Sequence, residues 1–382
     1  MEAIMNYNTP TKLGVKLSAL GIGCMRFPLV KGESDPKKVD MENAGKILRY
    51  AIDNGVNYID TAYVYSGGDN EKIVGELLEG EYRDKVYLAT KLPAWQCEKP
   101  EDMERIFNEQ LANLRTDHID FYLVHSLSLD KWEKMRALGV REFLDRLKKE
   151  GKIRFACFSF HDNYKAFETI LNDYDWDMCQ IQYNFMGTDE QATTKGLELA
   201  GEKGIPVVIM EGLLGGKLAK APANVQKIYD EYKEKRSPAE WAYRWLCNLP
   251  QIAVVLSGVT DMEMTKDNIR IFSEAYKGCM SEDDLEMMRR ARAEYEARTK
   301  VGCTACKYCM PCPAGVDIPG IFARWNDAFQ YSENIAGNRA YKRMIEKECD
   351  ATRCVECRAC EAVCPQHISI PEMLKKAHGE LV

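Results

Sequence analysis

Two runs of four cysteines near the carboxyl end of the chain constrain its fold more than any other feature. The first run consists of Cys303, Cys306, Cys309 and Cys312, and the second of Cys354, Cys357, Cys360 and Cys364. The second run has the spacing C-x2-C-x2-C-x3-C-P, which is typical of thiolates that bind a 4Fe–4S cluster. We therefore expect two 4Fe–4S clusters in this part of the chain.

The two runs resemble each other beyond their cysteines. The segment Cys312–Pro319 matches Cys364–Pro371 at the cysteine, at both prolines and at two apolar positions. The first run has one residue fewer between its third and fourth cysteines. Such a duplication predicts two clusters in a pseudo-twofold arrangement, and the fourth cysteine of a run usually binds the cluster of the other run.

A pair of zinc sites is the alternative, because C-x2-C pairs also bind zinc tetrahedrally. Zinc usually takes two separated pairs rather than four cysteines closed by a proline. Cys349 is a further cysteine in this region, which we interpret as a spare thiol, with a substitute ligand as the second interpretation. The remaining cysteines have no ligand spacing and are interpreted as small apolar residues.

The amino-terminal residues, the apolar stretches and the net charge indicate the cellular compartment and the classes of partner to expect. Residues 1–10 are polar and lack the apolar core of a signal peptide, so we expect reduced thiols in the cytoplasm, with an anaerobic cell as a hypothesis. No stretch approaches the roughly 18 apolar residues that cross a membrane. The net charge of −7, without a long Lys/Arg block, argues against a nucleic-acid partner.

Upstream of the cysteines, short apolar segments alternate with helical stretches, as in βα units on a parallel sheet. Eight strands are expected, at residues 20–24, 57–62, 86–91, 119–126, 153–160, 178–184, 206–211 and 252–258. Eight such strands over about 250 residues predict an α/β fold of the (β/α)8 TIM-barrel type. A doubly wound sheet is the alternative, but no G-x-G-x-x-G motif follows the first strand.

A chain of 382 residues has room for two domains. We expect the barrel over residues 1–280, a helical linker over 281–300, and a small, mainly helical dicluster ferredoxin-like domain over 301–382. Helices are expected between the cysteine runs, at residues 318–329 and 341–348.

Ionisable side chains stand at the ends of consecutive expected strands. Asp60, Lys91 and His125 end the second, third and fourth strands, and Tyr65 lies in the loop after Asp60. In a TIM barrel these ends meet at the carboxyl face, where barrel enzymes carry out their chemistry. A lysine cation lowers the pKa of a neighbouring tyrosine from its ordinary value of about 10, and Asp60 can hold Lys91 by ion pairing. His125 can then orient a carbonyl oxygen toward Tyr65.

The residues around this set carry a family resemblance. The segments Asp60–Tyr65, Ala89–Lys91 and Tyr122–His125 resemble the aldo-keto reductase superfamily, and Gly21–Met25 and Gln180–Asn184 extend the resemblance over essentially the whole barrel. The full chain resembles the subgroup of that superfamily with a dicluster ferredoxin-type tail. The resemblance implies reduction of an aldehyde or ketone by hydride from NADH or NADPH.

The resemblance also implies roles for single residues. Tyr65 would be the general acid, assisted by Lys91, Asp60 and His125. The cofactor-binding residues would be Gly23, Cys24, Met25, Ser159, Gln180, Met210, Gly212, Leu213, Gly258, Asp267 and Asn268. Ser159 and Gln180 would hold the nicotinamide amide.

The sequence departs from the family pattern at the residues that contact the nicotinamide and at those that contact the 2′-phosphate of NADP. Phe160 replaces the usual asparagine, and Met210 stands where an aromatic ring stacks on the nicotinamide. The basic residues that bind the 2′-phosphate of NADP are missing near Gly258, although Lys217 or Lys266 could substitute. We expect weak discrimination in favour of NADP, because each lost contact is a charge-assisted hydrogen bond.

A nicotinamide transfers two electrons as hydride, whereas each cluster passes one electron at a time, so three interpretations stay open. In the first, the barrel is a carbonyl reductase whose clusters exchange electrons with a ferredoxin- or flavodoxin-like partner. In the second, the glycines after the last two strands hold a flavin. In the third, the clusters are structural or redox-sensing. The intact set of four ionisable residues favours the first. The substrate would be a small carbonyl compound, with Phe27, Tyr63, Trp95 and Trp132 as candidate pocket walls.

Overall fold

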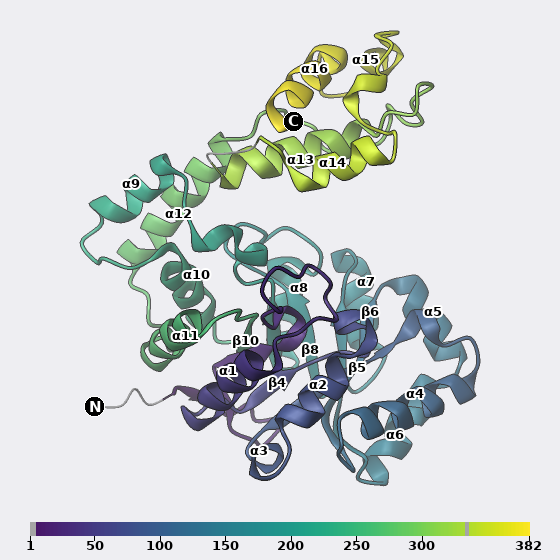
Figure 1. Ribbon diagram of the computed structural model, residues 1–382, viewed down its shortest axis with the longest axis vertical. Coiled ribbons are helices and arrows are strands. Elements are labelled where there is room, and N and C mark those ends of the chain that lie inside the picture. Colours follow the sequence, from purple (N-terminus) through teal and green to yellow (C-terminus); the bar gives the residue numbers. More distant parts are fainter. Residues whose placement is uncertain (1–4, 333–335) are drawn as a thin grey trace. The chain divides into compact units, whose positions relative to one another are not determined.

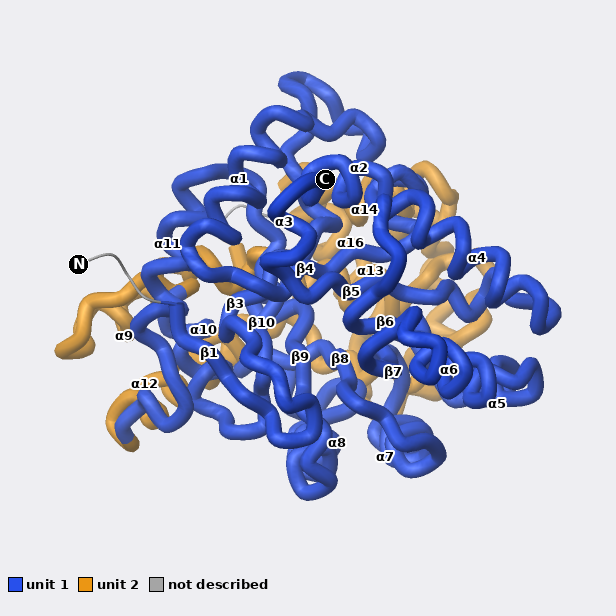
Figure 2. The backbone as a smooth tube through the Cα atoms, turned by 90° about the horizontal axis from the view of Figure 1, so that it is seen from below, with its two compact units in different colours: residues 1–215, 240–281 blue, residues 216–239, 282–382 orange. Residues whose placement is uncertain are grey.

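The computed structural model describes residues 5–332 and 336–382, and the chain divides into two compact units. The first unit contains the residues up to Gly215 together with 240–281, and the second contains 216–239 together with 282–382 (Figure 2). Nothing in the sequence separates residues 216–239 from the barrel, so their place in the second unit was not anticipated. The domain limits expected at 280 and 300 stay predictions.

The first unit is built on a closed parallel barrel, in which each strand pairs with the next along the chain and the last pairs with the first (Figure 1). Its strands are β3 (Leu20–Gly23), β4 (Tyr58–Asp60), β5 (Tyr87–Pro93), β6 (Ile119–Leu127), β7 (Ile153–Phe160), β8 (Met178–Gln182), β9 (Val207–Met210) and β10 (Ile252–Ser257). The predicted TIM barrel is therefore confirmed. The doubly wound alternative is wrong, since a doubly wound sheet is open at its edges.

Strand residues fill the barrel because their side chains alternate between its interior and its outer face. Tyr58 and Phe121 pack inside the barrel with ring centroids 5.1 Å apart, and both are fully buried. A short antiparallel ribbon, β1 (Tyr7–Asn8) with β2 (Leu17–Ser18), precedes the first barrel strand.

Amphipathic helices cover the outside of the barrel. They are α1 (Met41–Asp53), α2 (Asn70–Leu77), α4 (Pro100–Asn113), α5 (Leu129–Ala137), α6 (Val140–Lys149), α7 (Tyr164–Asn172), α8 (Thr193–Glu202), α10 (Pro238–Cys247) and α11 (Met262–Glu274). The short helix α3 (Glu81–Asp84) has no buried residue. In α1, the Asp40 side chain accepts a hydrogen bond from the backbone N–H of Asn43 and so caps the helix. Ile47, Leu48 and Ala51 of α1 form a buried stripe, which packs in the main core between strands and helices.

The second unit is mainly helical, as predicted. Its helices are α9 (Ala223–Glu231), α12 (Glu282–Ala297), α13 (Ile318–Tyr331), α14 (Arg339–Glu346), α15 (Ala359–Ala362) and α16 (Ile370–Leu381). The internal duplication is visible in α13 and α16, because Pro319 and Pro371 lie in the first turns of these two helices and stop them from extending backwards. Within the described residues, no helix has the length and apolar character needed to span a bilayer.

Candidate active site and iron–sulfur ligands

Asp60 and Lys91 form a buried ion pair at the carboxyl ends of β4 and β5. Lys91 Nζ lies 2.6 Å from Asp60 Oδ1 and donates a second hydrogen bond to the carbonyl oxygen of Thr61 at 2.7 Å. Burial acts to lower the pKa of Lys91, but Asp60 and Tyr65 outweigh it and raise that pKa, so the ammonium stays charged at neutral pH. Burial raises the pKa of Asp60, and Lys91 opposes this rise.

Tyr65 begins η2 (Tyr65–Gly68), the short helix that follows β4. Lys91 Nζ lies 4.9 Å from the centroid of its ring. Burial raises the pKa of Tyr65, and the Lys91 charge acts in the expected direction but only limits the rise. The pKa therefore lies above its ordinary value, contrary to the expected lowering. A phenol of this kind stays protonated at neutral pH and can donate its proton.

His125 lies beside Tyr65, with ring centroids 6.1 Å apart and ring planes at 80°. Its Nδ1 atom is buried and has no hydrogen-bond partner among the described residues. Burial, followed by the charge of Lys91, lowers the pKa of His125 to about 2. The imidazole is therefore neutral, and its single N–H can donate to a carbonyl oxygen. β5 runs two residues and β6 one residue beyond the ends predicted for them, and Lys91 and His125 lie inside their strands.

A buried hydrogen-bond network fixes the loop that carries Tyr65. Thr61 Oγ1 donates to Asn70 Oδ1 at 2.6 Å, and Asn70 Nδ2 donates to Ser66 Oγ and to the carbonyl oxygen of Cys24, both at 3.0 Å. Ser66 has a φ of 50°, a conformation that needs such support in a residue other than glycine. The sequence does not reveal this network, because a threonine and an asparagine nine positions apart have no recognisable pattern.

A second buried network lies behind Lys91. Glu71 Oε1 accepts hydrogen bonds from Thr90 Oγ1 at 2.5 Å and from Gln110 Nε2 at 2.7 Å. Gln110 also donates to the carbonyl oxygen of Lys91 at 3.1 Å. The network therefore holds the backbone of β5 at Lys91, which carries the buried ammonium. The sequence does not reveal this contribution, because Glu71 and Gln110 lie on helices far from Lys91 in the sequence.

Ser159 and Gln180 face each other in register on β7 and β8, as a shared role at the nicotinamide requires. Ser159 Oγ accepts a hydrogen bond from the backbone N–H of Ser126 at 2.7 Å. Gln180 Nε2 lies 3.7 Å from Met210 Sδ, whereas Gln180 Oε1 is buried and has no partner among the described residues. A carboxamide N–H of a nicotinamide would satisfy this oxygen, so the residues present fit the cofactor.

Arg26 is a cation at the expected phosphate end that the sequence analysis missed. It ends η1 (Cys24–Arg26), and its Nη1 donates to the carbonyl oxygen of Gly215 at 3.0 Å. A Cβ on Gly258 would lie 3.3 Å from Arg26 Cδ, so the arginine side chain packs against the loop after β10. Its hydrogen bond to Gly215 also places it beside the loop after β9. The available signal was a basic residue directly after the Gly21–Met25 motif.

The other residues expected to bind the cofactor differ in burial and in packing. A Cβ on Gly212 would lie 2.8 Å from Leu246, so this glycine permits close packing on α10. Cys24 is buried, and burial raises the pKa of its thiol. Leu213 is half-buried, and Met25 is 48% exposed. A Cβ on Gly23 would meet only the carbonyl group of Ser257, at 3.7 Å.

The residues expected at the adenine end already have protein partners. Asn268 is buried and donates to Ser257 Oγ at 3.0 Å, and Asp267 pairs with Arg270 at 2.9 Å. Lys266 Nζ lies 5.7 Å from the ring centroid of Tyr50. Lys217 belongs to the second unit, where its Nζ lies 2.5 Å from Asp327 Oδ1.

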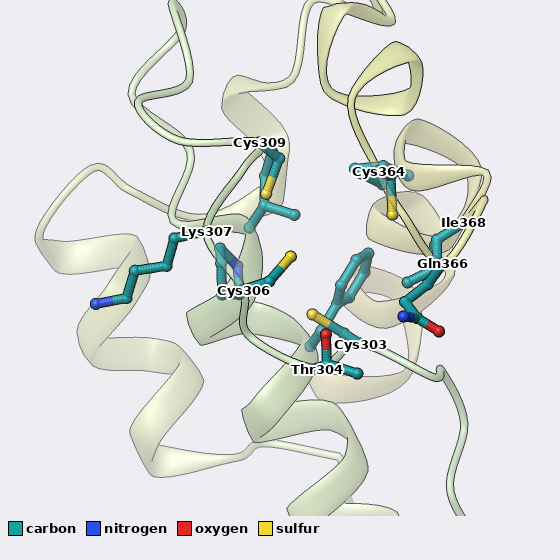
Figure 3. Close-up of a pocket in the computed structure, with 12 residues that line it drawn as sticks. Cys303, Thr304, Cys306, Lys307, Cys309, Cys364, Gln366 and Ile368 are labelled. Atoms are coloured by element: carbon teal, nitrogen blue, oxygen red, sulfur yellow. The ribbon is translucent and has the colours of Figure 1, made fainter.

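Four cysteines of the second unit line one pocket (Figure 3). They are Cys303, Cys306, Cys309 and Cys364. Three come from the first run and the fourth from the second run, so the two runs meet at this pocket. The exchange of the fourth ligand between two clusters stays a prediction. Apolar residues, among them Pro319 and Phe322, line the same pocket. In the part of the chain that the structure describes, no three His, Cys, Asp or Glu side chains lie close enough to hold a single metal ion.

The other cysteines of the two runs are Cys312, Cys354, Cys357 and Cys360. Most of them pack against the core of the second unit, and Cys357 is exposed. The half-buried Cys349 accompanies them, and its carbonyl oxygen accepts a hydrogen bond from the N–H of Asp317 at 3.0 Å. Cys349 therefore supports the start of α13 through its backbone.

Comparison with protein families agrees with this geometry. The model of the aldo/keto reductase family matches residues 19–278, and the model of the 4Fe-4S dicluster domain matches residues 302–368. The first match spans more than half of the chain, which therefore belongs to the aldo/keto reductase family. It is an oxidoreductase with a 4Fe–4S domain, so the second match favours iron–sulfur clusters over zinc.

Individual relatives cover the barrel. The chain is 25% identical to the uncharacterized oxidoreductase YqkF of Bacillus subtilis over 324 residues, which are 74% of this chain and 99% of that protein. It is 25% identical to the NADH-specific methylglyoxal reductase of Escherichia coli over 278 residues, 62% of this chain and 83% of that protein. The holo form of aldo-keto reductase AKR11C1 from Bacillus halodurans shares the fold with a TM-score of 0.62 and 22% identity, covering 75% of this chain and 96% of that chain. These comparisons give the flavin interpretation no support.

Proposed function

We propose that the barrel reduces a small aldehyde or ketone with NADH or NADPH, and that Tyr65 supplies the proton. The observation that carries this proposal is the buried Lys91–Asp60 pair beside Tyr65 and the neutral His125. Bound NAD(P)H would supply a hydride to the carbonyl carbon. The products are then the alcohol and NAD(P)⁺.

Each residue of the set has a distinct task in this reaction. The neutral His125 donates a hydrogen bond to the carbonyl oxygen and orients it toward the phenol. Tyr65 gives its proton to that oxygen as the alcohol forms. Lys91 stabilises the phenolate that remains, and Asp60 keeps Lys91 charged and in place. Ser159 and Gln180 hold the carboxamide of the nicotinamide, and the unpaired Gln180 Oε1 accepts one of its N–H groups.

Both nicotinamide cofactors are compatible with the proposed site, with a slight preference for NADH. Arg26 can pair with the pyrophosphate that both cofactors share. Asn268 and Lys217 are engaged with other residues and offer no evident ligand for a 2′-phosphate. One relative is named an NADH-specific reductase.

The second unit is proposed to hold two 4Fe–4S clusters that pass single electrons. Cys303, Cys306, Cys309 and Cys364 would bind the first cluster. By the internal duplication, Cys354, Cys357, Cys360 and Cys312 would bind the second. A ferredoxin- or flavodoxin-like protein would exchange electrons with them, and reduced cytoplasmic thiols in an anaerobic cell would suit these ligands.

The test uses protein purified without air and analysed for iron, sulfide and flavin. It is then assayed with NADH or NADPH that carries deuterium at C4, against a panel of aldehydes and ketones. We expect deuterium at the carbinol carbon and no bound flavin. We also expect about eight irons per chain, because two 4Fe–4S clusters contain four irons each. Bound flavin together with deuterium lost to water would contradict direct hydride transfer.

A further inference from the structure

Lys131 is a cation at the mouth of the barrel that the proposed mechanism does not use. It lies in the first turn of α5, is half-buried, and has no carboxylate within ion-pairing distance among the described residues. Its Nζ donates to the carbonyl oxygen of Ser126 at 2.7 Å and lies 3.3 Å from Ser126 Oγ. An ammonium has three N–H donors, so one is left for a further acceptor.

The surroundings of Lys131 connect it with the reacting groups. Its Nζ lies 5.4 Å from the ring centroid of Trp95, and that ring lies 5.1 Å from the ring centroid of His125. The ammonium is therefore no farther from the imidazole than the sum of these two distances. Its charge also contributes to lowering the pKa of both His125 and His161.

Ser126 forms hydrogen bonds both with Lys131 and with Ser159, which is expected at the nicotinamide end of the site. It follows His125 directly and has a φ of 55°. Its backbone N–H donates to Ser159 Oγ, while its carbonyl oxygen accepts from Lys131. The position of the ammonium is thus set by the backbone beside His125, although no carboxylate within the described ranges 5–332 and 336–382 pairs with it.

We propose that the substrate is a carbonyl compound with an anionic group, such as a carboxylate, and that Lys131 binds this group while Trp95 contacts the carbon skeleton. This inference rests on the proposed carbonyl reduction and names the substrate class. The anion lies one ring length or a few bonds from the carbonyl, because the Trp95 ring lies near both Lys131 and His125. Among the other candidate pocket walls, Phe27 is 4% exposed and the Tyr63 hydroxyl donates to Glu109 at 2.7 Å. Trp132 is 1% exposed and donates to Asp173, so it is a core residue.

The test compares two para-substituted benzaldehydes, the anionic 4-carboxybenzaldehyde and the similarly sized but neutral 4-isopropylbenzaldehyde, as well as the smaller 4-methylbenzaldehyde, with the anaerobically purified full-length protein. The variants are Lys131→Met, Lys131→Arg and a control, Lys134→Met. Lys134 lies one turn further along α5 and pairs with Glu98 at 2.7 Å, away from the reacting groups.

For the wild-type protein and Lys134→Met, we expect kcat/KM to favour the carboxylate by about tenfold or more, the lower end for a charge-assisted hydrogen bond. Lys131→Met should lose this preference through a higher KM for the carboxylate, with the neutral aldehydes changed less than about threefold. Lys131→Arg keeps the positive charge and should retain most of the preference for the carboxylate. Equal turnover of the carboxylate and the isopropyl compound by the wild type, or equal losses of both in Lys131→Met, would overturn this inference alone. Failure to reduce any aldehyde or ketone would overturn the proposed function and this inference with it.

Discussion

At the scale of single residues, the Asp60–Lys91 pair is the group on which the site's electrostatics depend. Removing one partner of a buried pair leaves the other charge without compensation, which typically costs about 3–5 kcal/mol. We therefore expect Lys91→Met to lower the free energy of unfolding by about this amount and to abolish turnover.

The double variant Lys91→Met/Asp60→Asn separates stability from catalysis. Replacing Asp60 removes the orphaned charge, so part of the lost stability should return, while turnover should not. Urea unfolding followed by tryptophan fluorescence gives the stability, and NADH oxidation gives the activity. A double variant no more stable than Lys91→Met would contradict the assignment of the cost to the unpaired carboxylate.

The low pKa of His125 predicts how the free energy of unfolding depends on pH. The folded pKa of about 2 lies below the ordinary value of about 6.5, so the unfolded chain binds this proton first as the pH falls. Stability is therefore lost below about pH 6.5, by about 2 kcal/mol at pH 5 from this group alone. His125→Gln should lack this component. A ¹³C-histidine titration should show the His125 ring neutral at pH 5, and a ring that titrates near 6.5 would refute the prediction.

At the scale of elements, the contact between α2 and α4 holds the network behind Lys91. Gly75 of α2 approaches α4 so closely that a Cβ would lie 2.4 Å from the carbonyl oxygen of Asn113. Backbone cannot move aside as a flexible side chain can. We expect Gly75→Ala to separate the two helices and to cost about 1–3 kcal/mol, as overpacking usually does.

Gly45 of α1 is the matched control for this helix contact. Its Cβ would meet only the side-chain atom Leu77 Cδ2, at 3.2 Å. Gly45→Ala should therefore change the thermal midpoint much less than Gly75→Ala, and alanine's helix propensity should offset part of its cost. Equal shifts of the midpoint in the two variants would contradict the backbone contact as the cause.

The proposed exchange of ligands between the two cysteine runs can be tested at the scale of elements. Cys364→Ser should impair the cluster proposed at Cys303, Cys306 and Cys309, whereas Cys312→Ser should impair the other. The measurement is electron paramagnetic resonance of the reduced protein, with Cys303→Ser and Cys354→Ser as references. If the spectrum of Cys364→Ser matches that of Cys354→Ser rather than that of Cys303→Ser, each run binds its own cluster.

At the scale of the whole molecule, the regular features were predictable from the sequence and the long-range side-chain contacts were not. Strand periodicity and cysteine spacing are local signals, so the barrel, the helical second unit and the strand-end residues followed from them. Arg26 and Glu71 contact residues distant in sequence, and Lys131 approaches the ring of Trp95, also distant in sequence. No local pattern encodes these contacts. The pKa of Tyr65 was misjudged for the same reason, since the sequence shows the lysine but not the burial.

The role of Tyr65 as the proton donor is central to the proposed reaction. It is tested by the ratio of kcat for an aldehyde between the wild-type protein and Tyr65→Phe, with NADH affinity checked by fluorescence. We expect a loss of about 10²–10⁴-fold, the usual contribution of a general acid, with NADH binding unchanged. Turnover of Tyr65→Phe within a few-fold of the wild type would contradict this role.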